Sequence, residues 1–256
     1  MSDRPPAGPL IGLLVAPPAG PPADLLVAPR VGPLTRELLL TGDLADIVAR
    51  ANPGVRVLTA EERATSLAAI LAARPDPSRD LWVFAYGSLI WNPLLEIAEE
   101  RMAVATGWHR AFCLNARSGR GTPENPGLML GLRPGLRCHG AILRIAEADI
   151  AHELDLLWRR EMVADGYIPR WVPVEDAEGD PIGHAIAFTI NPDGPAYTGD
   201  LPEPETIRRL ATASGSLGSA AEYLFNTRDG LRRMGISDPF VERLGALVEA
   251  EMARAG

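Results

Sequence analysis

One carboxylate in this sequence is expected at a position where a charge is costly. A helix is predicted over residues 147 to 162. Its apolar stripe contains Ile150, Leu154 and Leu157. Glu161 follows Ile150 by eleven residues, which at about 100° per residue places it about 20° away, on the inward face. Burial and the negative end of the helix dipole both favour the neutral acid, so we expect Glu161 to have the raised pKa of a general base.

A purely structural role for Glu161 is the alternative. Its carboxylate could form an ion pair with Arg160, Arg170 or Arg120, or it could reach solvent where the helix frays. The pattern of apolar residues alone leaves both roles open.

A second stretch, VFAYGSLIW at residues 83 to 91, runs from a strand-like segment into a tight turn. The turn could be an ordinary connection in the core. It could also bind an anion through its N–H groups, because Gly87 has no Cβ to keep a ligand away from the backbone. We expect Gly87 to adopt a left-handed conformation. Ser88 lacks the Gly-x-Ser-x-Gly context of a hydrolase nucleophile.

The composition restricts the classes of partner. The chain has 256 residues, 46% of them hydrophobic, and a net charge of −8, which argues against nucleic-acid binding. No apolar stretch reaches the roughly 18 residues that a membrane helix needs. The only cysteines are Cys113 and Cys138, without a CxxC motif or histidines at metal-binding spacing. We therefore expect a reduced, cytoplasmic protein with no metal and no contact with a membrane.

The elements around Glu161 and the turn predict an α+β fold built on a mainly antiparallel, barrel-like sheet flanked by helices. Strands are predicted at 81–86, 102–108, 110–115, 128–132, 138–144, 167–174 and 183–190. Helices are predicted at 34–52, 147–162, 203–213, 217–229 and 238–254, and another after the capping box formed by Thr59 and Glu62. The helices gather at both ends of the chain, which does not fit a doubly wound sheet.

Three regions are expected along the chain. Residues 1–33 contain nine prolines and a near-repeat, LLVAPP and LLVAPR, which is typical of a disordered, proline-rich leader. An apolar arm that docks on the domain is the alternative for this segment. Residues 34–78 are predicted to form an N-terminal helical extension, and residues 79–256 the main domain.

Six segments in a fixed order carry a resemblance. They are FAYGSLIWNP at 84–93, GWHRAFCL at 107–114, GRGTPENPG at 119–127, LLWRREM at 156–162, GY at 166–167 and EYLF at 222–225. Together they resemble the ChaC-type γ-glutamylcyclotransferases, especially the bacterial branch. The resemblance extends from about residue 35 to about residue 250, and it implies the mainly antiparallel β-barrel of that family.

The resemblance also implies roles for individual residues. The catalytic glutamate of the family follows an arginine at the end of a helix, which corresponds to Arg160 and Glu161 here. The residues that it implies for substrate binding are Tyr86, Gly87, Ser88, Leu89, Arg120, Tyr197 and Tyr223. The α-amine of the substrate is the nucleophile and closes a five-membered ring on the γ-carbonyl, so no serine or cysteine nucleophile is needed.

The implied activity is that of a glutathione-specific γ-glutamylcyclotransferase, which releases 5-oxoproline and cysteinylglycine without a cofactor. The expected partner is this small-molecule substrate, and the expected assembly is a monomer or weak dimer. Two alternatives remain: a cyclotransferase for other γ-glutamyl amino acids or amines, and a non-catalytic regulatory module linked to cation transport. Gly119 stands where eukaryotic members commonly have a histidine, and Ala220 stands where members often have an asparagine, so the roles of that histidine and that asparagine are not carried over.

Overall fold

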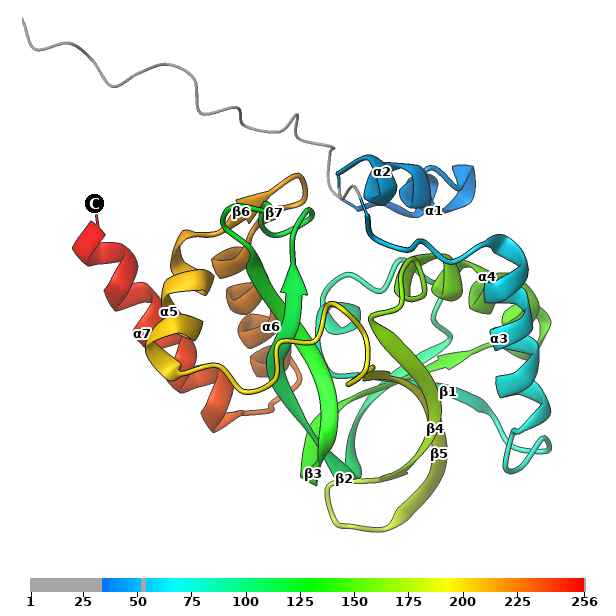
Figure 1. Ribbon diagram of the computed structural model, residues 1–256. Coiled ribbons are helices and arrows are strands. Elements are labelled where there is room, and N and C mark those ends of the chain that lie inside the picture. The colour runs from blue at the N-terminus through cyan, green and yellow to red at the C-terminus, as the bar shows by residue number, and fades with distance from the viewer. Residues whose placement is uncertain (1–33, 52–53, 256) are drawn as a thin grey trace, which may run out of the picture.

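Five strands close into a barrel in the order β1-β3-β2-β4-β5. Their bounds are β1 Leu81–Ala85, β2 Glu99–Ala116, β3 Gly127–Ile145, β4 Tyr167–Glu175 and β5 Pro181–Ile190. Neighbours in this order are antiparallel, and β5 completes the barrel by a parallel pairing of Ile186 with Val83 of β1. The computed structural model describes residues 34–51 and 54–255, and it confirms the predicted α+β barrel (Figure 1). The predicted leader, 1–33, lies outside the described residues.

Strands β2 and β3 form one long hairpin, whereas the sequence pattern predicts four shorter strands in this region. The predicted break near His109 is a β-bulge: Gly107 has a φ of +86°, and the register shifts between Thr106 and Trp108. Pro134 pairs with Trp108 beside this bulge, where a strand tolerates a residue without an N–H group. These local signals bend the long strands and do not end them.

The segment before the barrel contains helices α1 Arg36–Thr41, α2 Leu44–Ala51 and α3 Ala60–Ala72. The single helix predicted over 34–52 is wrong, because Gly42 adopts a φ of +80° and separates α1 from α2. The predicted capping box of α3 is confirmed: the side chain of Thr59 accepts from the N–H of Glu62, and the Glu62 carboxylate accepts from the N–H of Thr59. The limits of the extension and the main domain stay predictions.

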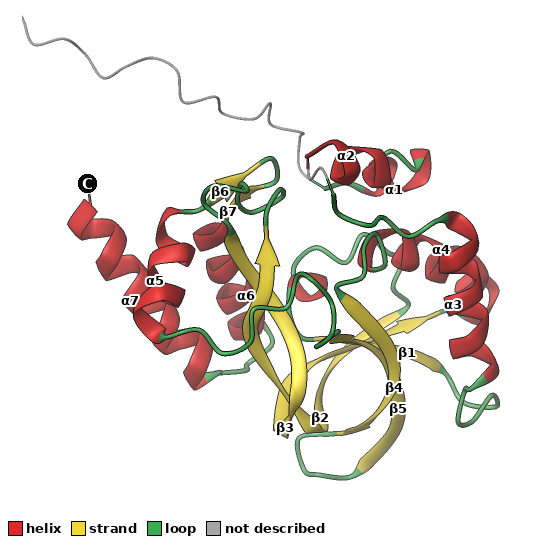
Figure 2. Ribbon diagram, in the orientation of Figure 1, coloured by secondary structure: helices red, strands yellow, loops and turns green. Residues whose placement is uncertain are grey.

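The remaining helices lie on two sides of the barrel (Figure 2). They are α4 Ile150–Glu161, α5 Glu203–Thr212, α6 Ala220–Arg233 and α7 Pro239–Ala255, with the short 3₁₀ helices η1 Ser88–Ile90 and η2 Glu147–Asp149 and the two-stranded β6 Ser214–Gly215 and β7 Gly218–Ser219. Helices α5, α6 and α7 group beside β2 and β3, whereas α3 and α4 lie on the other side, near β4. Among the helices of the described residues, none combines the length and apolar character needed to cross a membrane.

The barrel core fixes where the functional turn lies. Every residue of β1 is buried, and Val83 and Phe84 are fully inaccessible to solvent. Leu154 and Leu157 of α4 are also fully buried, so the apolar stripe of this helix faces the core as predicted. The last turn of α4 and the end of β1 are therefore anchored in one core.

Candidate active site

A small cavity lies where the end of β1, the 3₁₀ helix η1 and the last turn of α4 come together. Its lining residues are Tyr86, Gly87, Ser88, Leu89, Leu130, Glu161, Tyr167, Phe188 and Tyr223. The cavity volume is about 20 Å³, which is room for about one water molecule. Six of the residues that the sequence analysis selected therefore surround a single small space.

Glu161 ends helix α4 and faces this cavity. Its side chain is 13% exposed, and its Oε1 lies 2.9 Å from Nε of Arg160. Burial raises the pKa of Glu161, and this effect outweighs the opposing charge and hydrogen bond of Arg160. The ion pair considered as the structural alternative is thus present, yet the raised pKa expected of a base is present too.

Arg160 connects the glutamate to the turn. The guanidinium is buried and donates to the carbonyl oxygens of Asn92 and Pro93, the latter at 2.7 Å, and to Oγ of Ser88 at 3.0 Å. Burial lowers the pKa of Arg160, and the charge of Glu161 counteracts this shift. One arginine is therefore shared among four acceptors, which holds the segment after the turn against the end of α4.

The turn itself differs from expectation at Gly87. Its φ is −143°, so the predicted left-handed conformation is wrong. Glycine is instead required by a close approach: a Cβ at this position would lie 2.9 Å from Oη of Tyr223 and 3.6 Å from Cδ1 of Leu130. The N–H groups of Ser88 and Leu89 begin η1, and within the described residues they have no hydrogen-bond acceptor. They are available to a ligand.

Three tyrosines complete the wall of the cavity. The hydroxyl of Tyr86 donates to the carbonyl oxygen of Phe188 at 2.7 Å, and that of Tyr167 donates to the carbonyl oxygen of Leu130 at 2.9 Å. Burial raises the pKa of Tyr86 and Tyr167 well above the ordinary value, and that of Tyr223 to about 12. All three are thus neutral hydrogen-bond donors at physiological pH.

Two residues selected from the sequence lie elsewhere. Arg120 is buried, binds Oε2 of Glu222 at 2.9 Å and lies 5.8 Å from the ring centre of Trp91, but it does not line the cavity. Tyr197 lies under the guanidinium of Arg133, at 5.7 Å, also outside the lining. Their roles in substrate binding remain predictions.

Three lining residues were not selected from the sequence: Leu130, Tyr167 and Phe188. Tyr167 carried a signal, since it belongs to the GY segment that opens a predicted strand. Leu130 and Phe188 carried none, because they are ordinary strand residues that only barrel closure brings to this space. Within the described ranges, no three His, Cys, Asp or Glu side chains gather as metal ligands would.

Comparisons with known proteins agree with this architecture. The ChaC-like protein family matches residues 81–251. The chain is 40% identical to the glutathione-specific γ-glutamylcyclotransferase of Escherichia coli, over 80% of this chain and 87% of that protein. It is 29% identical to the human glutathione-specific γ-glutamylcyclotransferase 1, over 66% of this chain and 78% of that protein.

A solved structure supports the fold independently. The crystal structure of a γ-glutamyl cyclotransferase specific to glutathione from yeast matches with a TM-score of 0.61, at 22% identity, over 68% of this chain and all of that chain. At this identity the match shows a shared fold only. The family match covers most of the chain, and the similarity to the E. coli protein extends further. The chain therefore belongs to the family of ChaC-like proteins.

Proposed function

We propose that this protein is a glutathione-specific γ-glutamylcyclotransferase that converts glutathione to 5-oxoproline and cysteinylglycine. The observation that carries the proposal is Glu161, a largely buried carboxylate with a raised pKa, which lines the same cavity as Ser88 and Leu89, the two residues at the start of η1 whose N–H groups have no acceptor within the described residues. The names of the E. coli and human relatives support glutathione as the substrate.

The reaction needs positioning and proton transfer. The α-amine nitrogen of the γ-glutamyl group attacks its γ-carbonyl carbon, the new C–N bond closes a five-membered ring, and the bond to the cysteinyl nitrogen breaks. Folding the substrate so that amine and carbonyl meet can supply roughly 7–11 kcal/mol. Glu161 accepts a proton from the α-ammonium before the attack and passes it to the departing nitrogen as the C–N bond breaks. The ring nitrogen loses a second proton as the lactam forms, and this proton reaches the departing amine, which leaves as the ammonium of cysteinylglycine.

The other groups of the cavity stabilise charge. The carbonyl oxygen becomes negative as the ring closes, and N–H groups fixed at the start of η1 can donate to it without rearranging. The buried Arg160 guanidinium holds this turn through Ser88 and also contacts Glu161. We assign Tyr86 and Tyr223 to the wall that orients the γ-glutamyl group.

Substrate binding requires this cavity to widen. A space of about 20 Å³ holds about one water molecule, far less than a γ-glutamyl group. The hydroxyl of Tyr223 lies closest to the turn, directly over Gly87. We propose that displacement of Tyr223 opens the site.

The direct test is to incubate the purified protein with glutathione and with a panel of γ-glutamyl dipeptides and amines, in the presence of a chelator, and to measure 5-oxoproline. Glutathione as the preferred substrate supports the proposal. Preference for another member of the panel would make the protein a cyclotransferase of different specificity, and binding without turnover would favour the regulatory module. Light scattering during gel filtration tests the predicted monomer or weak dimer.

A further inference from the structure

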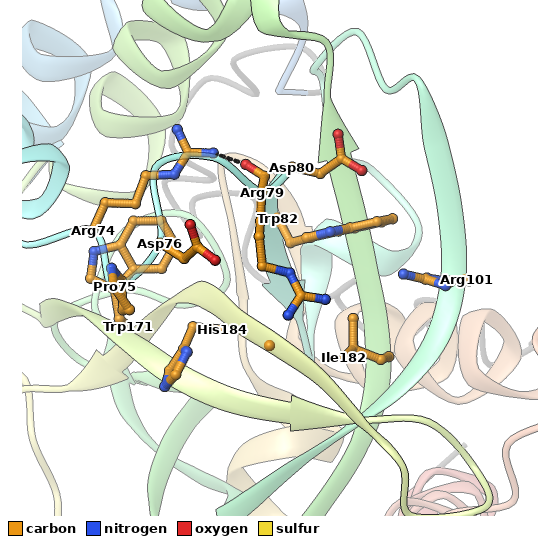
Figure 3. A pocket seen from close by; sticks show the side chains of 11 residues that line it. Arg74, Pro75, Asp76, Arg79, Asp80, Trp82, Arg101, Trp171, Ile182 and His184 are labelled. Carbon is orange, nitrogen blue, oxygen red and sulfur yellow. Dashed lines mark hydrogen bonds between the residues drawn. The ribbon is translucent and has the colours of Figure 1, made fainter.

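A second hollow lies at the other end of β1 from the catalytic cavity. It has a volume of about 330 Å³ and is formed by the loop after α3, the start of β1 and the beginnings of β2 and β5, with β4 at one side (Figure 3). Ligand sites commonly have volumes of about 300–1,000 Å³. None of the residues of the catalytic cavity lines it.

Arginine side chains surround this hollow although the chain has a net charge of −8. Two of them, Arg74 and Arg101, interact with other groups of the protein. Arg74 donates to the carbonyl oxygen of Arg79, and Arg101 lies 4.6 Å from the ring centre of Trp82 and 3.8 Å from a carboxylate oxygen of Glu99.

Arg79 is different. Within the described residues its guanidinium has no hydrogen bond or ion pair, and Figure 3 shows it pointing into the space between His184 and Ile182. It lies over the backbone of β5, where Gly183 has no side chain: a Cβ there would be 3.8 Å from Cζ of Arg79. The donors of Arg79 therefore face a ligand-sized space.

The two acidic residues of the rim have partners of their own, although Asp76 also lies within the field of Arg79. Hydrogen bonds from Ser78 lower the pKa of Asp76, and the charges of Arg79 and Arg74 lower it further. The carboxylate of Asp76 accepts from the N–H of Ser78 at 3.0 Å and from its hydroxyl at 2.6 Å. Asp80 lies 3.9 Å from the guanidinium of Arg144. Three arginines and two aspartates line the hollow, so its rim carries a surplus of one positive charge. A single surplus charge neutralises a monoanion, whereas a dianion would keep one uncompensated charge, which is costly to desolvate.

The remaining wall is apolar and rigid. Trp171 donates from its indole nitrogen to the carbonyl oxygen of Ile70 at 2.8 Å, which fixes the ring. Trp82 is only 6% exposed and is held on the barrel by β1. The ring of Trp171 and the side chain of Ile182 offer a surface for an apolar group beside the guanidinium of Arg79, whereas the ring of Trp82 is covered by Arg101.

We propose that this hollow binds a small organic carboxylate that carries an apolar group. The carboxylate binds the fork of N–H donors on Arg79, which matches two oxygens in one plane. The apolar group packs against Trp171 and Ile182. The site is separate from the proposed catalytic one, so the inference does not depend on the enzymatic reaction.

Benzoate is a suitable probe because it unites one carboxylate with a flat apolar ring. Calorimetric titration of the full chain should give a Kd of about 1 mM or tighter. Benzamide, of the same shape but neutral, should not bind, and phenyl phosphate, a dianion, should bind more weakly. Equal binding of benzamide, or no binding of benzoate, would overturn the proposal, and tighter binding of phenyl phosphate would overturn the monoanion assignment.

Arg79→Gln should weaken benzoate binding about 10- to 100-fold, as expected when a charge-assisted hydrogen bond is lost. Arg79→Lys should give an intermediate affinity, since it keeps the charge and loses the fork. Arg254→Gln, on the exposed last turn of α7, removes the same charge at a distant place and should leave binding unchanged. Unchanged binding by Arg79→Gln contradicts the site.

A second variant tests the hollow without touching its arginines. Ile182→Glu places a carboxylate beside the expected ligand and should abolish benzoate binding by repulsion. Melting temperature verifies the fold of each variant, and 5-oxoproline production should stay at the wild-type level in Arg79→Gln. Competition between benzoate and 5-oxoproline would show that benzoate occupies the catalytic cavity, and would overturn the assignment to this hollow.

Discussion

Helix α4 carries two buried glutamates, eight residues apart, whose pKa values shift in opposite directions. Glu153 lies in the first turn with a side chain that is 2% exposed, and Glu161 ends the last turn with one that is 13% exposed. The pKa of Glu153 is lowered and that of Glu161 is raised. Both side chains have little contact with solvent, but Glu161 lies deeper among protein atoms, so the depth of burial and the partners of each carboxylate together explain the difference in sign.

The partners of the first carboxylate explain its shift. Both oxygens of Glu153 accept from the guanidinium of Arg36, and one of them also accepts from the N–H of Glu96 at 2.9 Å. Burial acts to raise the pKa of Glu153, but these hydrogen bonds and the charge of Arg36 lower it further than burial raises it. The positive end of the helix dipole acts in the same direction. Glu153 is a structural anion that joins α1 to α4.

The partners of the second carboxylate are fewer. Glu161 has one arginine, Arg160, whose other donors go to Ser88, Asn92 and Pro93. The helix dipole is unfavourable to a negative charge at this end. The number of donors and the depth of burial therefore together separate a structural glutamate from one that can exchange a proton.

The largest expected effect is on turnover, from Glu161→Gln. Glutamine keeps the shape and removes the base, so 5-oxoproline production from glutathione should fall about 10²–10⁴-fold. The melting temperature at neutral pH should not fall, since the charged form of Glu161 is disfavoured in the folded protein. Activity above about a tenth of the wild-type level would contradict the assignment of Glu161 as the base.

The next largest effect is expected from a change in the turn at Gly87, which lines the same cavity as Glu161. Gly87→Ala places a methyl group against the hydroxyl of Tyr223 and next to the N–H groups of Ser88 and Leu89. Loss of an oxyanion donor lowers rates about 10²–10³-fold, and overpacking costs about 1–3 kcal/mol of stability. Melting temperature and 5-oxoproline production should be measured on the same variant.

A matched control separates these two losses. Gly87→Ala combined with Tyr223→Phe removes the hydroxyl that the methyl group would meet, so stability should recover by comparison with Gly87→Ala alone. A folded Gly87→Ala protein with wild-type turnover would show that the turn is only a connection between β1 and η1.

The sequence contained enough to select Glu161 but not to recognise Glu153. Both residues follow a helical pattern, and the phase of Glu161 relative to Ile150 indicated burial. The pairing of Glu153 with Arg36 joins residues 117 positions apart, which no local pattern encodes. The fold class followed from the order of strands and helices, whereas barrel closure, which places Leu130 and Phe188 in the cavity, is a long-range result.

A smaller effect, on stability, is expected for Glu153→Gln. This change leaves the hydrogen-bonding shape but removes the charge that Arg36 binds, and charge-assisted hydrogen bonds contribute about 1.5–3 kcal/mol. Part of the loss is recovered because the side chain of Arg36 is 28% exposed and can be hydrated. Urea unfolding should show lower stability with turnover near the wild-type level. A large loss of turnover with unchanged stability would contradict the distinction between the two glutamates.

The smallest expected effects are in the pH dependence of stability, to which both carboxylates contribute. The ordinary pKa of a glutamate is about 4.3. Glu153 has a lowered pKa in the folded protein, so its stabilising contribution is present above the ordinary value and is lost as pH falls through the lowered one. Glu161 has a raised pKa, so its destabilising contribution is present above the raised value and disappears below the ordinary one. The same raised pKa sets the acid limb of kcat/KM, which should rise with pH through it.

The free energy of unfolding of each glutamine variant, measured with urea across this pH range, should therefore diverge from that of the wild type, and the two variants should diverge in opposite directions. At neutral pH, Glu161→Gln should be as stable as the wild type or more so, and the two should converge once pH falls below the ordinary value. Glu153→Gln should be less stable at neutral pH and should converge with the wild type only at still lower pH. If Glu161→Gln is instead the less stable protein at neutral pH, its pairing with Arg160 stabilises the fold. Glu161 would then be the same kind of structural anion as Glu153, which is the alternative that the helical pattern left open.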